Sequence, residues 1–242
     1  MSWDTQNHHI YLGWVAAQAR FEQDYFAAST QSYQFPYLYW PVYQMAKWRL
    51  LGWQAGVVWA LMHSLVAIPL WVMAKALIPV PGKEAAMYRV AAVVLGVFNI
   101  LVLRAPETPA NDVLAAIPYV WAVAIGLWGI RDEDARRVVG GSLGLAACVG
   151  GLGGLSVALK LSNGMLVLIL PLLCMAFNGR MLQRMGAVFI CALSVALVFG
   201  VVYGWWGWQL WVHFGNPVFP FYDSVFEPLR TWFNWQPHGV LK

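Results

Sequence analysis

Long apolar runs separated by short charged breaks constrain this chain more than any other feature of its sequence. A helix that crosses the hydrocarbon core of a bilayer, about 30 Å thick, needs about 20 apolar residues. Six runs reach or approach that length: residues 52–74, 85–103, 112–130, 138–159, 164–177 and 185–203. The breaks between them are too short for a soluble domain, and the sequence has no internal repeat. The runs therefore predict an all-α fold, a polytopic transmembrane bundle of about six spanning helices.

Composition agrees with this prediction and excludes other classes. Hydrophobic residues make up 60% of the chain and charged residues 11%. In a typical soluble domain, about half of the residues are apolar and about a quarter are charged. A net charge of +4, spread so sparsely, excludes an electrostatic nucleic-acid binder, and the hydrophobicity excludes disorder. The cysteines Cys148, Cys174 and Cys191 lie within apolar runs without metal-ligand spacing, as small buried residues do.

Basic residues predict which side of the membrane each connecting segment faces. Seven of the 15 Lys and Arg residues fall in three short segments, 75–86, 131–137 and 178–184. By the positive-inside rule these segments are cytoplasmic. We therefore predict one integral membrane domain over residues 1–242, with an outer-side loop (1–51), a transmembrane bundle (52–204) and an outer-side aromatic tail (205–242).

The outward N-terminal segment needs something to translocate it. It carries charged residues, and no apolar run within the sequence precedes it. We expect either a first helix upstream of Met1 or a truncated or divergent copy of a larger protein.

Polar and aromatic residues are concentrated in this outer loop. Residues 10–21 can form an interfacial helix, because Leu12, Val15 and Ala19 fall on one face. Asp4, just ahead of it, fits either a general base at the membrane surface or a helix N-cap. His8 and His9 fit interfacial polar residues better than metal ligands, since adjacent histidines on a helix point about 100° apart.

Two charged residues stand at the ends of apolar runs on the outer side. Asp112 begins a run after a proline-rich break, where a carboxylate also complements the helix dipole. Lys160 interrupts the sequence LSVALKLSNGMLVL, and either snorkels to the interface or, with Asn163, holds a phosphate group. The run that follows, 164–177, is short, so it borrows a turn from residues 160–163 or forms a broken or re-entrant helix.

The C-terminal tail is rich in tryptophan, as is typical of a membrane-interface belt, and a Gly-Asn-Pro turn around Asn216 follows it. Motifs of soluble enzymes such as GxSxG, the P-loop, HExxH and GxGxxG are absent from the sequence.

Several strings, taken in chain order, resemble a known group. They are the N-terminal Trp3, Asp4, Asn7, His8, His9, Tyr11 and Trp14, then Arg20 to Asp24, QSYQFP (31–36), ETPAND (107–112), LKLSNG (159–164) and HFGNPVFPFYD (213–223). This pattern is similar to the GT-C superfamily of bacterial membrane glycosyltransferases, which use polyprenyl-phosphate-linked sugars. Two departures stand out: that fold normally has more than six spans, and residues 1–50 contain no DxD pair.

The resemblance implies an activity and a set of residues. The expected protein is an inverting hexosyl- or pentosyltransferase of the bacterial inner membrane, whose partners are a lipid-linked sugar donor, membrane lipids and a glycan, lipid or protein acceptor. Asp4 matches the position of the catalytic base in the first outer loop, and would also be the ligand of a divalent metal ion if one is used. The substrate-binding candidates are His8, His9, Arg104, Asp112, Lys160, Asn163 and Asn216. Lys160 and Arg104 would lie near the lipid phosphate.

Two other classes of function stay open. A small membrane transporter is one, although transporters often carry polar residues within their spans, and here these residues gather at one interface. An inactive or accessory fragment of a GT-C-like protein is the other.

Overall fold

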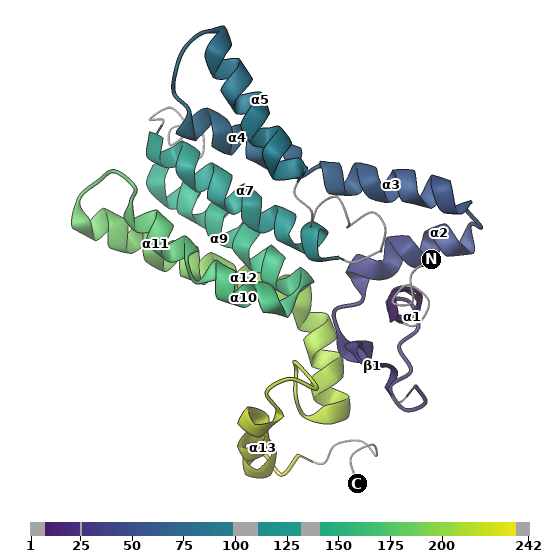
Figure 1. Ribbon diagram of the computed structural model, residues 1–242. Coiled ribbons are helices and arrows are strands. Elements are labelled where there is room, and N and C mark those ends of the chain that lie inside the picture. Colours follow the sequence, from purple (N-terminus) through teal and green to yellow (C-terminus); the bar gives the residue numbers. More distant parts are fainter. Residues whose placement is uncertain (1–7, 25, 99–110, 132–140, 236–242) are drawn as a thin grey trace. The chain divides into compact units, whose positions relative to one another are not determined.

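A computed structural model describes residues 8–24, 26–98, 111–131 and 141–235 of the chain (Figure 1). The prediction of an all-α helical bundle is confirmed, with one short strand, β1 (Ala27–Thr30), among these residues. Contacts divide the chain into two compact units. We call Gly56–Gly200 the central unit, and Met1–Ala55 with Val201–Lys242 the terminal unit.

The central unit is built from apolar helices packed side by side. α5 (Lys83–Val97) packs on α4 (Ala67–Leu77), α4 on α7 (Asp112–Arg131) and α7 on α9 (Gly141–Leu159), in the order seen in Figure 1. The short helices α10 (Gly164–Val167) and α11 (Leu170–Met175) pack against α9, and α11 also contacts α7. The core between these helices is apolar and fully enclosed, and includes Leu145, Val149, Leu170, Phe177 and Cys191.

Four helical segments among the described residues are long and apolar enough to cross a membrane: Gly52–Leu77, Asp112–Arg131, Gly141–Leu159 and Met181–Phe214. The count of about six is therefore reduced to four in this part of the chain. The predicted span 85–103 continues into residues outside the described ranges, and its described part, α5, has 15 residues. The segment 164–177 is a broken helix, one of the two predicted alternatives, and residues 161–163 add a 3₁₀ turn, η5 (Leu161–Asn163), before α10.

A proline explains why the first span consists of two helices. α3 (Gly52–Ser64) and α4 meet at a turn over residues 65–66. Pro69 has no N–H to donate to the Leu65 carbonyl, which instead accepts a hydrogen bond from Ile68 N at 3.2 Å. The apolar run 52–74 thus has the composition of one span but the hydrogen bonding of two helices.

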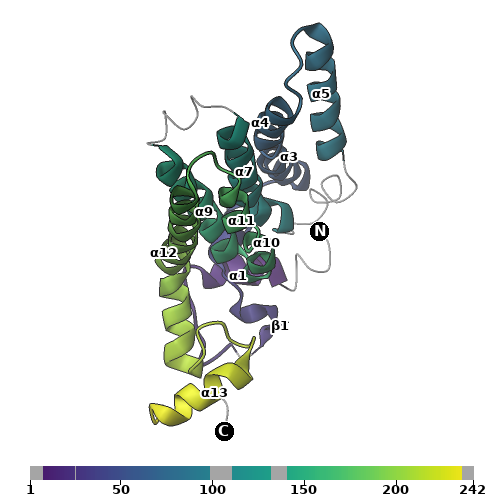
Figure 2. The same ribbon diagram turned by 90° about the vertical axis from the view of Figure 1, so that its left-hand side faces the viewer.

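α12 (Met181–Phe214) is much longer than the predicted span 185–203. Its 34 residues extend over about 51 Å at 1.5 Å per residue, and Figure 2 shows them as one continuous helix. The tryptophan-rich segment predicted as a tail is therefore the end of this helix. Residues up to Gly200 belong to the central unit and those from Val201 to the terminal unit.

The N-terminal segment of the terminal unit contains α1 (Ile10–Val15), η2 (Gln31–Tyr33), η3 (Tyr37–Tyr39) and α2 (Trp40–Lys47). The predicted interfacial helix 10–21 was too long. Leu12 and Val15 are buried as expected, but Ala19 is exposed and the chain leaves the helix after Val15. Phe21, beyond the end of the helix, is buried and packs its ring edge-on against Phe214.

Aromatic packing joins the two ends of the chain in the terminal unit. The Phe21 ring contacts Trp206 and Phe214, with centroids 5.3 and 5.7 Å apart, and Tyr33 packs edge-on against Phe214 at 5.0 Å. Trp206 also donates an indole hydrogen bond to the Tyr33 carbonyl at 3.0 Å. The N-terminal loop and the end of α12 thus pack on one another.

Candidate functional site

The central unit brings together two residues that the sequence analysis singled out separately. Lys160 Nζ forms an ion pair with Asp112 Oδ1, although the residues lie 48 positions apart. α7 begins at Asp112 and α9 ends at Leu159, so the antiparallel packing of these helices places both residues at the same end. The lysine side chain is 28% exposed and the carboxylate 69%.

A buried polar network holds this end of the unit together. Asn163 donates from Nδ2 to the Ala115 carbonyl (3.2 Å) and to the Ser156 hydroxyl (3.0 Å), while Ser156 Oγ donates to the same carbonyl at 2.7 Å. Both side chains thus bond to one backbone carbonyl of α7, that of Ala115. Asn163 therefore fixes the η5 turn, and with it Lys160, against α7.

Helix electrostatics also favour the positions of the charged pair. A carboxylate in the first turn of α7 and an ammonium just after α9 each complement the nearby helix dipole. An exposed ion pair adds only about 0–1 kcal/mol of stability. The pair can therefore open at little cost, which leaves the Lys160 ammonium available to another anion.

The terminal unit contains the other described candidates. His8 and His9 are both buried, and the His9 ring stacks on Tyr39 with centroids 5.0 Å apart. Nearby, burial raises the pKa of Tyr11 to about 12, and the Asp24 carboxylate contributes in the same direction. Asp4 and Arg104 lie outside the described residues, so their predicted roles stay predictions.

Asn216 organises the turn after α12. Its Nδ2 donates to the Phe221 carbonyl (3.0 Å) and to Asp223 Oδ1 (3.2 Å), and its Oδ1 accepts from Val218 N (2.9 Å). Arg230 makes a two-bonded contact with the same aspartate, at 2.7 and 2.9 Å. These contacts give the buried Asn216 amide a structural role in the turn. Its substrate-binding role stays a prediction.

The Asp223–Arg230 contact predicts a dependence on pH. The hydrogen bond from Arg230 holds the pKa of Asp223 below its ordinary value, against a smaller opposing effect of burial. A carboxylate with a depressed pKa stabilises the fold above its ordinary pKa of about 4, and this stabilisation disappears as the pH falls through the folded-state value. Asp223→Asn is expected to speed hydrogen exchange in residues 215–232 at pH 7, and the difference from wild type should shrink toward zero below about pH 4. An equal difference at pH 7 and at pH 3 would contradict this prediction.

Sequence reasoning missed Ser156, the two-bonded Asp223–Arg230 contact and the role of Phe21. Ser156 was detectable, because Ser156, Lys160 and Asn163 follow one another at i, i+4 and i+7, the spacing of one helical face. Metal binding has no further support in the described part of the chain, where no three His, Cys, Asp or Glu side chains cluster as ligands.

Comparisons with known proteins identify no relative: no family model, curated protein or solved structure matches the chain.

Proposed function

We propose that this integral membrane protein is a glycosyltransferase that transfers a sugar from a polyprenyl-phosphate donor to an acceptor on the outer side of a bacterial inner membrane. The observation that supports it most is the contact between Asp112 and Lys160. Both were predicted from the sequence as substrate-binding residues, and they meet across 48 residues of chain.

The chemistry of the pair suits a lipid phosphate. The Lys160 ammonium is held by one carboxylate and a buried asparagine fixes its turn, so a phosphate monoester or diester can replace Asp112 without rearranging the helices. As the donor reacts, the departing polyprenyl phosphate is already a stable anion, and the protein has mainly to position it and to supply a base. In this proposal Asp4 is that base, Arg104 assists at the phosphate, and a divalent metal ion at Asp4 is optional.

Binding of undecaprenyl phosphate tests the proposed donor site. Lys160→Gln should weaken its affinity about tenfold or more, because a hydrogen bond to a charged group contributes about 1.5–3 kcal/mol. Asp112→Asn should tighten binding, since the carboxylate no longer competes for the ammonium. Native mass spectrometry of the protein in detergent micelles measures both affinities.

Two matched controls make this experiment specific. Undecaprenol, which lacks the phosphate, should bind wild type and both variants equally. Lys75→Gln, which removes an exposed lysine on the predicted cytoplasmic side, should leave phosphate binding unchanged. If Lys160→Gln binds undecaprenyl phosphate as tightly as wild type, the Asp112–Lys160 pair is only a structural clamp.

One observation favours the alternative class, a small membrane transporter. His63 lies within the first span, is 1% exposed, and donates from Nδ1 to the Trp59 carbonyl at 2.8 Å. Its Nε2 has no hydrogen-bond partner within the described residues, and buried ionisable groups within spans often mark transport pathways. Proton flux into proteoliposomes that His63→Gln abolishes, together with no measurable sugar transfer, would favour transport.

A further inference from the structure

α13 (Asp223–Trp232) has an apolar face that the described part of the protein covers only along one edge. Val225, Phe226, Leu229 and Trp232 recur at i, i+1, i+4 and i+7, and therefore lie on one side of the helix. Val225 is 61% exposed and Trp232 80%, whereas Phe226 and Leu229 are half-buried. The aromatic side chains of Tyr222 and Phe233, which flank the helix, are exposed as well.

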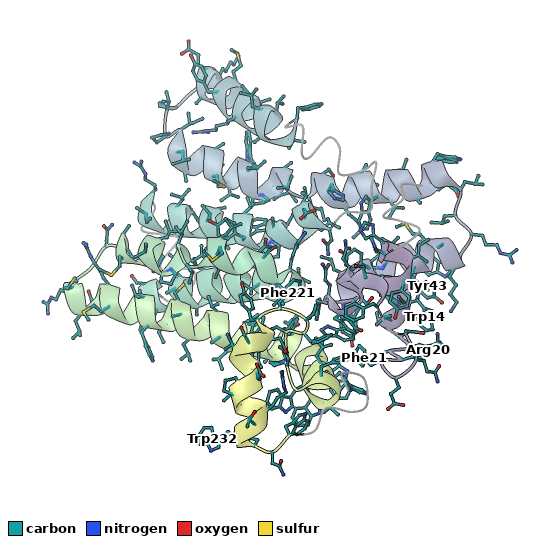
Figure 3. The ribbon with its side chains drawn as sticks, turned by 60° about the horizontal axis from the view of Figure 1, so that its bottom comes forward. Trp14, Arg20, Phe21, Tyr43, Phe221 and Trp232 are labelled. Carbon is teal, nitrogen blue, oxygen red and sulfur yellow. The ribbon has the colours of Figure 1, made fainter. Side chains whose placement is uncertain are left out.

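The orientation of this face is fixed by contacts on another side of α13. Arg230 bonds to Asp223 at 2.7 Å and approaches the Gly215 carbonyl at 3.4 Å. At 100° per residue, these two residues lie on the side of the helix roughly opposite Val225 and Trp232. The bonds to the turn therefore hold the apolar stripe outward, and Figure 3 shows Trp232 at the outer end of α13.

The turn before α13 leads back along α12 toward the membrane. The Tyr203 hydroxyl donates to the Pro217 carbonyl at 3.2 Å, so the chain after Phe214 runs back beside the preceding turns of α12. About 20 helical residues cross the hydrocarbon core. A span that starts near Arg184, on the predicted cytoplasmic side, therefore reaches the outer interface near Tyr203. Trp205 and Trp208, both exposed, fit that level, where tryptophan is enriched.

From these contacts we infer that α13 is a membrane-interface helix, whose apolar face inserts into the outer lipid surface of the bilayer that holds α12. Zwitterionic lipid is sufficient for this binding. The helix carries two carboxylates, Asp223 and Glu227, against one guanidinium, Arg230, so attraction to anionic headgroups does not contribute. Insertion depends instead on apolar area, and tryptophan and tyrosine at its edges suit the interface. This inference does not rest on the proposed enzymatic activity.

Spin labels on adjacent residues test this inference in the full chain. Cys148→Ala provides the background, since Cys174 and Cys191 are fully buried. Val225→Cys and Trp232→Cys place labels on the apolar face, and Ser224→Cys and Thr231→Cys place matched labels on the polar face. The protein is reconstituted in phosphatidylcholine nanodiscs, and collision rates with oxygen, which dissolves in lipid, and with an aqueous nickel chelate are measured.

The oxygen-to-nickel collision ratio should be several-fold higher at positions 225 and 232 than at 224 and 231. It should not change when a third of the lipid is replaced by phosphatidylglycerol. High nickel access at all four positions would show α13 in water, and would overturn the inference. Protection of positions 225 and 232 from both reagents would also overturn it, because a protein surface, such as a second copy of this chain, would then cover the face.

Discussion

Asp4→Asn is expected to lower sugar transfer from a polyprenyl-phosphate donor by about 10²–10⁴-fold, the usual cost of losing a general base. Asparagine keeps the shape of the side chain and caps a helix about as well as aspartate, so expression and folding should be unaffected. The rate is measured with a radiolabelled polyprenyl-phosphate sugar in membranes that contain the full-length protein.

Asp24→Asn is the matched control in the same loop. Asp24 accepts two hydrogen bonds from Arg20, at 2.8 and 3.0 Å, and Arg20 in turn lies over the Trp14 ring, as Figure 3 shows. The Arg20 side chain is 50% exposed and that of Asp24 14%, so loss of this ion pair should cost about 1 kcal/mol of stability and little activity. Near wild-type transfer by Asp4→Asn would return Asp4 to a capping role and remove the main residue-level support for an enzyme.

Gly150→Ala and Gly154→Ala should each destabilise the central unit by about 1–3 kcal/mol or more, the range of overpacked cores. A Cβ on Gly150 would lie 2.1 Å from the Cys191 carbonyl oxygen, and one on Gly154 would lie 2.4 Å from that of Val195. Both contacts are with the backbone of α12, which cannot rotate away as a side chain can. Thermal unfolding in detergent micelles measures the loss.

Two other glycines separate this effect from helix propensity. Gly151 is in the same helix, and a Cβ there would meet only the Val198 side chain, at 3.5 Å; at Gly200 it would meet nothing within 4 Å. Alanine is the better helix former by about 1 kcal/mol, so Gly151→Ala and Gly200→Ala should be neutral or stabilising. Equal stability of Gly150→Ala and Gly151→Ala would show that α9 and α12 do not pack this closely.

Hydropathy predicted the central helices well, because each depends on a local sum of side-chain transfer energies. The predicted run 112–130 corresponds to α7 (Asp112–Arg131). The predicted run 138–159 ends at the same residue as α9. The errors have local explanations as well. Pro69 divides the first span, α1 ends at Val15 before the buried Phe21, and α12 continues through the tryptophans to Phe214.

The candidate site was only partly predictable. Asp112, Lys160 and Asn163 were predicted as site residues because burying a charged or amide group at membrane depth costs free energy, and such residues usually have a function. Their mutual contact was not visible, since it depends on the pairing of α7 with α9. In the same way, four glycines of α9 (150, 151, 153 and 154) look equivalent in the sequence, and only the helices packed against α9 distinguish them.

The sequence by itself determined that this is a helical membrane protein, where its long helices lie, and which connecting segments are basic. Those properties depend only on residues close together in the sequence, because an apolar run can be buried in lipid without a partner from elsewhere in the chain. The tertiary structure decided that Lys160 meets Asp112, that Phe21 and Tyr33 pack on the end of α12, and that α13 turns its apolar face outward. Lys160 and Asp112 lie 48 positions apart and Trp206 and Tyr33 lie 173 apart, so these contacts form only once the helices have packed.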